Sequence, residues 1–443
     1  MLDLSPELVT ILMFVGLLSG LLMGHSLAFV LGGLSVIFGF LGWGVGAFYM
    51  FVGRIYDIMD NYILVAIPLF IFMARFLDSS GVAGKLFDAM RFLFGPIRGG
   101  IAVTVIVVST LFGACTGIIG ASVVTMGLLA LPMMLKYGYD KRLSCGCITA
   151  GGSLGILIPP SIMLIVMGNQ ANLSVGKLFA GALGPGLLLS ALYIIYILVK
   201  CGFNPTLGPP ISKEESELVT KKEIGAMVLK SLLPPMILIL GVLGSIFFGI
   251  ATPTEASGVG VLLSFILVVA YGKFTWQSFF NMVKETATTT SMVLIVLAGA
   301  TCFTGVFLGL GGGDVVKELI LSIGFGKWGT FVFMMFILFI LGMFIDWIGI
   351  VMIVFPIFLP IADQLGFDRL WFVVTMALML QDSFLTPPFG YALFYLKGVA
   401  PPEVKTKDVY MGSLPFWEIM ELAVVIVIIF PQIITWLPSI LVE

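Results

Sequence analysis

The chain has 443 residues, of which 60% are hydrophobic and only 10% are charged, with a formal net charge of −2 and a mean hydropathy of +1.16. Soluble domains carry about 25% charged residues. The charged residues of this chain are too few to form a surface that is in contact with water all round. Its near-neutral charge also excludes the basic field that nucleic-acid binding requires. The sequence therefore predicts an all-α polytopic membrane protein that lies in a lipid bilayer.

In the first half, apolar runs lie near 8–24, 27–50, 62–78, 100–135, 143–168 and 178–200. Most have the length of one crossing, which is about 20 residues. The run at 100–135 is too long for one crossing, and small or hydroxylic residues interrupt it at 113–117 and 120–122. Non-helical backbone at membrane depth is tolerated only where protein shields it or where it lines a cavity. We therefore expect a re-entrant hairpin at about 100–135.

The second half repeats this pattern, with runs near 228–250, 253–272, 286–310, 329–362, 370–396 and 415–440 and a break at 346–349. The stretch GYDKRL at 138–143 returns as GFDRL at 366–370, and a double proline follows each copy, at 159–160 and at 387–388. Duplication explains these matches in one register. The sequence predicts a first repeat over 1–200 with a hairpin at about 100–135, a cytoplasmic linker over 201–227, and a second repeat over 228–443 with a hairpin at about 329–362.

Each repeat contains five spans and one hairpin, and an odd number of crossings inverts the second repeat relative to the first. Inverted repeats with discontinuous helices are typical of secondary transporters. If the N-terminus lies outside, all but five of the 22 Lys and Arg residues lie on the cytoplasmic side, as the positive-inside rule demands. The exceptions are Arg54, Lys177, Lys317, Lys327 and Arg369. We expect both termini in the periplasm. The segments 51–61 and 274–285 fit interfacial amphipathic helices or simple connecting loops.

Each double proline predicts a site for a cation. Two adjacent prolines remove two amide donors and unwind a helix, which leaves carbonyl oxygens free to bind sodium. The hairpin tips are expected to complete two sodium sites, one in each repeat. The candidate ligands are Thr116, Gly120, Ser122, Ser153, Gly155, Ile158, Asp346, Gly349, Asp382, Ser383 and Thr386. A simple proline kink satisfied by neighbouring helices is the structural alternative.

Half-helices that begin after such breaks direct their positive ends at one place, which favours an anionic solute. The candidate solute-binding residues are Thr116, Gly117, Ser122, Ser161, Asp346, Gly349, Thr386, Phe389 and Gly390. Asp346 is either a functional intramembrane carboxylate or a cap that accepts backbone amides. Glu255 follows Thr252 and Pro253 as in a capping box, so it has either a structural or a coupling role. The chain has no phosphate-binding loop and no His/Cys cluster, so we expect a transporter and not an enzyme.

Five stretches carry a family resemblance: FGACTGIIGASVVTMGLLALPMML at 112–135, GGSLGILIPPSIMLIVMG at 151–168, GIATPTEASGVGV at 249–261, GMFIDWIGIVMIVFPIFLP at 342–360 and LTPPFGYALFYLKGVAPP at 385–402. The chain resembles the large membrane subunit of TRAP transporters, the tripartite ATP-independent periplasmic carriers, along nearly its whole length. The resemblance implies inverted repeats with two hairpins, an elevator-type mechanism coupled to Na⁺, and location in the bacterial inner membrane.

The resemblance also implies two partners, a small four-helix membrane subunit on a separate chain and a periplasmic substrate-binding protein that delivers the solute. The solute implied is a small organic anion, either a carboxylate or a sulfonate, because the stretch 389–392 departs from the more polar family pattern. A stand-alone sodium/dicarboxylate carrier and a subunit of an energy-transducing complex are the alternative functions. The latter would need chains of buried Lys, Glu and His residues along the spans.

Overall fold

The computed structural model describes residues 5–117, 119–212, 214, 219–388 and 390–441. Within these ranges every regular element is a helix. The first half contains α1 (Pro6–Leu22), α2 (Leu27–Trp43), η1 (Gly44–Gly46), α3 (Ala47–Met59), η2 (Tyr62–Val65), α4 (Ala66–Ser80), α5 (Val82–Phe94), α6 (Gly100–Thr116), α7 (Ile119–Lys136), α8 (Lys141–Ser153), η3 (Leu154–Ile156), α9 (Ile162–Ala171), α10 (Val175–Phe203) and η4 (Pro205–Leu207). The second half contains α12 (Lys221–Phe247), α13 (Pro253–Ala270), α14 (Trp276–Gly309), α15 (Gly312–Ser322), α16 (Gly326–Gly342), α17 (Trp347–Gln364), α18 (Arg369–Asp382), α19 (Tyr391–Val399), α20 (Thr406–Ile429) and α21 (Gln432–Leu441).

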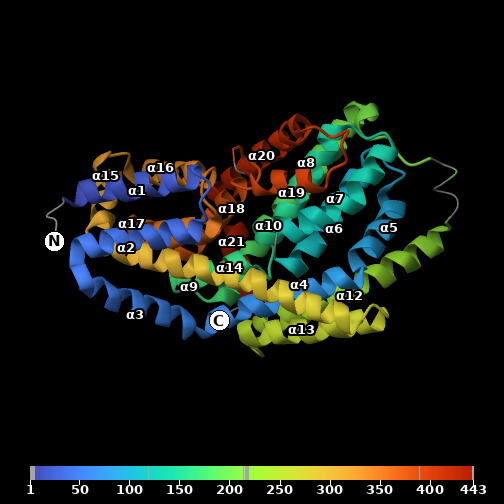
Figure 1. The fold of residues 1–443 in the computed structure, drawn as a ribbon. Helices are drawn as coiled ribbons and strands as arrows, with labels where there is room; N and C mark the ends of the chain where they lie inside the picture. Colours follow the sequence, from blue (N-terminus) through green and yellow to red (C-terminus); the bar gives the residue numbers. More distant parts are fainter. Residues whose placement is uncertain (1–4, 118, 213, 215–218, 389, 442–443) are drawn as a thin grey trace.

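The predicted membrane fold is confirmed. In the described part of the chain, nine helical segments are long and apolar enough to cross a bilayer. The two re-entrant hairpins are α6 with α7 and α16 with α17. They lie toward opposite ends of the molecule and direct their tips to its middle (Figure 1). This is the arrangement expected of two repeats that are inverted relative to each other.

The helix bounds follow the repeat register residue by residue. α7 and α17 begin at Ile119 and Trp347 and end at Lys136 and Gln364, while α8 and α18 begin at Lys141 and Arg369. Each pair is offset by 228, the same separation that joins Ser153 to Gln381. Asp140 caps α8 and Asp368 caps α18, and each side chain accepts a hydrogen bond from the backbone amide three residues later. The repeated aspartate of the sequence motif is therefore the N-cap of the helix that follows each hairpin.

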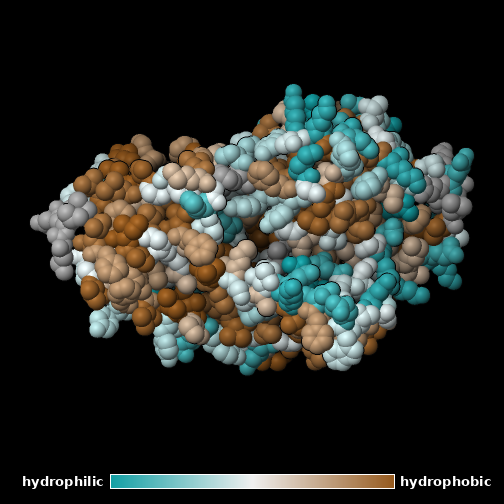
Figure 2. Space-filling view, in the orientation of Figure 1, coloured by the Kyte–Doolittle hydropathy of each residue, from teal (hydrophilic) through white to brown (hydrophobic). Residues whose placement is uncertain are grey.

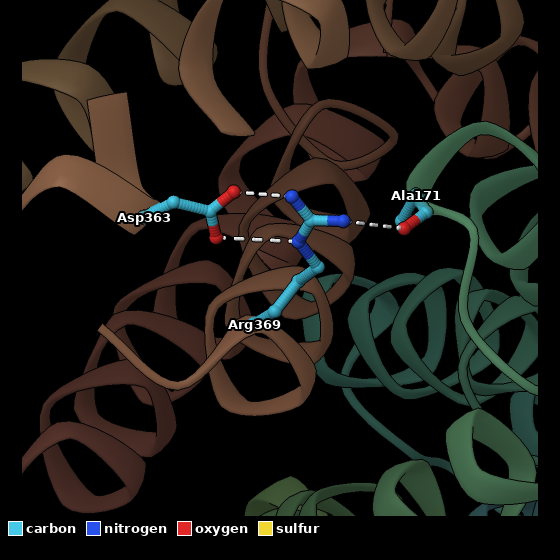
Figure 3. Close-up of polar contacts among 3 residues, drawn as sticks. All are labelled: Ala171, Asp363 and Arg369. Carbon is cyan, nitrogen blue, oxygen red and sulfur yellow. Dashed lines mark hydrogen bonds and ion pairs between the residues drawn. The ribbon is translucent and has the colours of Figure 1, made fainter. Parts of the chain in front are cut away.

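The two repeats are packed into each other crosswise. α2 of the first repeat lies along α14 of the second, and α13 of the second lies along α4 of the first. Polar contacts join the repeats in the same reciprocal way. Arg369, at the start of α18, forms a fork on Asp363 and donates to the Ala171 carbonyl at the end of α9 (Figure 3). Lys141, at the start of α8, donates to the Glu403 carbonyl beyond α19.

Two expectations about individual segments are wrong, and two short helices were not expected. The stretch 274–285 is not a separate interfacial helix, because α14 runs without interruption from Trp276 to Gly309. The run 415–440 is not one span, because α20 ends at Ile429 and Pro431 separates it from α21. The short helices α5 and α15 follow α4 and α14 but were not expected, since each is too short to cross a membrane.

The surface is uneven in character along the molecule. Figure 2 shows hydrophilic residues gathered over the end that contains α5, α7 and the start of α12, whereas the end that contains α1, α2 and α16 is largely hydrophobic on this face. The hydrophilic end contains the described residues that flank the segment between the repeats.

Candidate functional site

A cavity of about 290 Å³ lies at the centre of the molecule, and we call it the central cavity. Both hairpin tips reach it, through Gly117 of the first hairpin and Asp346 of the second. Both double-proline breaks also reach it, through Ile156 and Ile162 in the first repeat and Phe384 and Tyr391 in the second. α2, α4 and α14 complete the wall, α4 through Ile71. All four interruptions of the membrane helices therefore meet at one place.

The first hairpin turns at Gly117, which caps the C-terminus of α6 with a φ of 61°. Only glycine adopts this left-handed conformation freely. α6 continues to Thr116 and α7 begins at Ile119, so the expected breaks at 113–117 and 120–122 are wrong in extent. The Thr116 and Ser122 hydroxyls hydrogen-bond to each other at 3.0 Å and both side chains are buried. They brace the hairpin tip and do not line the cavity.

The second hairpin turns between Gly342 and Trp347. Asp346 is the N-cap of α17, and its carboxylate accepts a hydrogen bond from the Ile348 amide at 3.3 Å. Asp346 also lines the central cavity. It is therefore both a helix cap and a carboxylate that faces the cavity. Trp347 to Gly349 are already helical, which corrects the expected break at 346–349. Gly349 is buried against Leu27 and Ile345 and does not itself line the cavity.

The first double proline interrupts α8 and α9 as predicted. α8 ends at Ser153, η3 covers Leu154–Ile156, and α9 begins at Ile162 with Ser161 as its N-cap. The Ser161 hydroxyl donates to the Ile156 carbonyl and accepts from the Leu164 amide. Gly155 lies against Gly113 of α6, where an added Cβ would come within 2.9 Å of the Gly113 Cα. The hairpin and the broken helix thus meet backbone to backbone.

The remaining candidates of this repeat lie behind the cavity wall. The Ser153 hydroxyl donates to the Ala150 carbonyl at 2.9 Å. Ile158 is buried against Gly186 of α10. These two residues therefore support the break and do not face the cavity.

The second double proline interrupts α18 and α19 in the same manner. α18 ends at Asp382 and α19 begins at Tyr391, with Gly390 preceding it. Ser383 lies against Gly342 of the hairpin, so close that an added Cβ on Gly342 would be 2.6 Å from the Ser383 Cβ. The Thr386 hydroxyl donates to the Asp382 carbonyl at 3.1 Å and is buried. Phe389, the remaining candidate, lies outside the described residues.

The Asp382 carboxyl group is wholly buried, and neither of its oxygens receives a hydrogen bond from the described residues. Glu421 of α20 is the acidic group that approaches it, and an ionised carboxylate cannot donate. The neighbouring Gln381 Oε1 is also buried without a donor. Three buried acceptor oxygens without donors are costly unless a cation or a proton joins them.

Five helices begin at the central cavity. The first residues of α2, α7, α9, α17 and α19 all line it: Leu27, Ile119, Ile162, Trp347 and Tyr391. The first amides of a helix have no intrahelical partner, and the helix macrodipole places partial positive charge there. Among the described lining residues, none is Lys, Arg or His, and Asp346 is the sole carboxylate.

Of the predicted site residues, the structure places Gly117, Gly120 and Asp346 on the cavity surface. Gly120 lies against the Tyr395 ring, where an added Cβ would be 3.2 Å from the ring carbon Cζ. The hydroxyls of Ser122, Ser161 and Thr386 are used within the protein, as described above. Sequence reasoning missed Ser26, Thr289, Tyr391 and Tyr395, which line the cavity. The spacing of Tyr391 and Tyr395, four residues apart on one helix face, was a signal that could have been found.

Glu255 has a structural role and is not part of this site. Thr252 is the N-cap of α13, and the Glu255 carboxylate accepts hydrogen bonds from the Thr252 amide at 2.8 Å and the Thr252 hydroxyl at 2.9 Å. The predicted capping box is therefore present, and Glu255 is exposed and does not line the central cavity. Thr254, beside it, donates to the Tyr62 carbonyl at 3.3 Å and so ties α13 to the start of α4.

The family model for the tripartite ATP-independent periplasmic transporter, DctM component, matches residues 10–433. The chain belongs to this family. It is therefore a multi-pass membrane component of a three-part, ATP-independent transporter and not an enzyme.

Relatives with curated names agree with this assignment. The C4-dicarboxylate TRAP transporter large permease protein DctM of Vibrio cholerae is 30% identical and aligns over 97% of each chain. The sialic acid TRAP transporter large permease protein SiaM of the same organism is 29% identical over 96% of this chain and 97% of its own. The isethionate TRAP transporter permease protein DctMQ of Oleidesulfovibrio alaskensis is 30% identical over 85% of this chain and 58% of its own length.

A solved structure shares the fold. The YdaH transporter of Alcanivorax borkumensis superimposes with a TM-score of 0.62 at 15% sequence identity, covering 96% of this chain and 99% of the other. At this identity the likeness establishes the arrangement of the helices.

Proposed function

We propose that this chain carries out sodium-coupled uptake of a small organic anion, a carboxylate or a sulfonate, across the bacterial inner membrane. The observation that carries the proposal is the set of five helix N-termini that converge on one cavity with no basic side chain. Helix N-termini bind anions. The negative charge of Asp346 offsets part of their positive potential, so the anionic solute requires a further positive charge in the cavity. Bound sodium supplies that charge, and this is the physical reason for coupling.

Two sodium sites fit the breaks in the helices. One lies between the first hairpin and residues 153–159, where Gly113 and Gly155 bring two backbones together. The other lies between the second hairpin and residues 382–387, near the Asp382 oxygens that have no donor. Sodium prefers oxygen ligands, and carbonyls freed by the double prolines are of this kind.

The mechanism proposed is an elevator movement. The central cavity lies between the hairpins and broken helices on one side and α2, α4 and α14 on the other. Movement of the first group as one body past the second would carry the cavity from one face of the membrane to the other. The reciprocal contacts of Arg369 with Ala171 and of Lys141 with Glu403 hold the moving group together.

The proposed partners are a small membrane subunit with four helices and a periplasmic binding protein that delivers the solute. Relatives are named for C4-dicarboxylates, sialic acid and isethionate. Both carboxylates and sulfonates are therefore candidate solutes. The aromatic wall of Tyr391 and Tyr395 favours a solute with an apolar part next to its acidic group.

Transport by proteoliposomes that contain the chain and its small subunit tests the proposal. We expect uptake of one of succinate, N-acetylneuraminate or isethionate when a sodium gradient and the binding protein are both present. A potassium gradient of the same size is the control. Undiminished uptake without the binding protein would instead support the stand-alone carrier.

Equilibrium binding of the accepted solute at several sodium concentrations tests the coupling itself. Linkage requires that sodium raise solute affinity by the same factor as solute raises sodium affinity. A solute affinity that does not change with sodium would contradict the proposed site.

A further inference from the structure

A second cavity of about 340 Å³ lies next to Arg54, and we call it the Arg54 cavity. Polar side chains line this cavity although it lies between membrane helices. Its lining includes Asn61, Asn169, Gln170 and Thr301. None of these residues was among the candidates identified from the sequence.

The polar side chains of this cavity include donors for which the described residues supply no acceptor, and Asp57 is the carboxylate beside them. The Arg54 side chain is exposed at the mouth of the cavity, and its guanidinium forms no hydrogen bond or ion pair with the described residues, Asp57 of the same lining included. The Thr301 hydroxyl is buried without a partner. Asn61 donates to the Asn169 side-chain oxygen at 2.9 Å, which leaves the Asn169 amino group free to donate. A cluster of unsatisfied donors around a fixed cation is suited to an anion.

The fold holds Arg54 over the cavity. Its side chain crosses α14 at Gly305, where an added Cβ would lie 3.2 Å from the Arg54 Nε and 3.0 Å from the Met50 Sδ. Glycine at this position therefore leaves room for the arginine. An arginine among membrane helices is costly and normally marks a functional site or an interfacial anchor.

The Arg54 cavity and the central cavity are stacked along the same three helices. α9 lines the central cavity with Met163 and the Arg54 cavity with Val166. α17 does so with Ile348 and Met352. Residues three or four apart are neighbours on one helix face.

On α14 the two cavities meet at the adjacent residues Val296 and Leu297. No described residue lines both cavities, and the lining residues by which these three helices pass from one cavity to the other are all apolar. By contrast, the cavity beside Arg75 at the other end of α14 shares Thr289 with the central cavity. We call the apolar lining residues at which the two cavities approach each other, Met163, Val166, Val296, Leu297, Ile348 and Met352, the apolar layer.

We propose that the Arg54 cavity is a second anion site, which holds the carboxylate or sulfonate group of the solute before it passes the apolar layer into the central cavity. The proposal rests on the proposed function for the identity of the solute. With the N-terminus in the periplasm, as the distribution of Lys and Arg predicts, the end of α14 that the cavity approaches and the following α15 also face the periplasm. The anion site would therefore lie where the solute is released by its binding protein.

Charged thiol reagents test the site without reference to transport. The complete transporter in proteoliposomes carries Gln170→Cys, a lining residue, and the five native cysteines are buried. Labelling rates are compared for the anionic sulfonatoethyl and the cationic trimethylammonioethyl methanethiosulfonates. Opposite unit charges about 4 Å apart in water interact by ~1 kcal/mol, about a fivefold effect on each rate. We expect the anionic reagent to be preferred and Arg54→Gln to reduce the rate ratio at least about fivefold.

Matched variants make the result specific. Arg54→Lys keeps the charge and should keep most of the preference, and Lys317→Gln, on α15, should change nothing. Asp57→Asn removes the nearby carboxylate and should raise the preference, which gives a second readout if Arg54→Gln does not fold. An unchanged ratio in both Arg54→Gln and Asp57→Asn would overturn the anion site.

The occupant is identified by protection. Succinate or isethionate at tens of millimolar should slow labelling by the anionic reagent in vesicles of neutral lipid. Slowing by phosphatidylglycerol alone, with no effect of either solute, would assign the site to a lipid phosphate and overturn its role in solute passage. Loss of sodium-coupled uptake with these labelling results intact would contradict the proposed function and leave the anion site standing.

Discussion

The Gln381 amide donates to the Ser153 hydroxyl at 3.1 Å, and the two residues occupy the same position in the two repeats, 228 residues apart. Both residues are wholly buried. Ser153 is the last residue of α8 and Gln381 is the last but one of α18, so each lies just before a double-proline break. Since equivalent residues can meet only on the axis that relates the repeats, this hydrogen bond marks the pseudo-twofold axis of the molecule. It also joins the two proposed sodium sites directly.

This bond should be measurable as a coupling energy. Ser153→Ala leaves the Gln381 amide buried without its partner, which costs about 1–3 kcal/mol, whereas Gln381→Met removes the amide and keeps most of the volume. We expect Ser153→Ala to destabilise the protein more in the native background than in Gln381→Met, with a coupling of about 0.5–3 kcal/mol. Thermal unfolding in nanodiscs measures it, with the exposed Ser439→Ala as a control. Strict additivity of the two changes would show that the contact contributes nothing.

The first double proline should control the response to sodium. Pro159→Ala with Pro160→Ala allows α8 and α9 to join, which removes the free carbonyls, and we expect the sodium concentration for half-maximal uptake to rise about tenfold or more. The matched control is Pro234→Ala with Pro235→Ala, since that pair lies inside the continuous helix α12. An equal shift in both double variants would mean that the effect arises from general helix perturbation.

Asp382→Asn should weaken the second sodium site. The change removes the charge from a buried group that has no donor, and the amide can no longer balance a cation. We expect the dependence of uptake on sodium to become less steep, with a Hill coefficient that falls by about one. Glu421→Gln is the companion variant, because Glu421 approaches the same group from outside the proposed site. If uptake by Asp382→Asn keeps the full sodium dependence, the second site lies elsewhere.

The orientation in the membrane can be tested by cysteine labelling in intact cells. Ser322→Cys, on α15, should react with an impermeant maleimide, because α15 faces the periplasm if the N-terminus does. Glu214→Cys, in the predicted cytoplasmic linker, should react only after the cells are permeabilised. Both positions are exposed and the native cysteines are buried, so the background is low. Ready labelling at position 214 in sealed cells would contradict the predicted orientation and favour the opposite one.

The helix breaks were predictable because their cause is local. A repeated aspartate, a hairpin and a double proline in one register required only the sequence. Double proline alone is nevertheless not sufficient, since Pro234 and Pro235 lie within an unbroken α12. Membrane helices tolerate proline where neighbours satisfy the freed groups. The pair at 159–160 instead follows a glycine-rich stretch in which Gly155 of η3 lies against Gly113 of α6.

The cavity wall was less predictable because it depends on the rotation of each helix. Ser122 and Thr386 were expected to contact the solute, yet their side chains point to Thr116 and to the Asp382 carbonyl. Ser26 and Thr289 reach the cavity from α2 and α14, which no motif connects to the hairpins. Such residues become visible only when the packing of distant segments is known.

The crosswise packing of α2 on α14 and of α13 on α4 has a consequence for biosynthesis. α4 leaves the ribosome long before its partner α13, since α4 ends at Ser80 and α13 begins only at Pro253. At about 5–20 residues per second, synthesis of the roughly 170 intervening residues takes about 10–35 s. During that time the first repeat stands in the membrane with one flank of α4 uncovered. A nascent chain stopped at the linker is therefore a natural substrate for membrane chaperones and quality-control proteases, and completion of α13 ends that exposure.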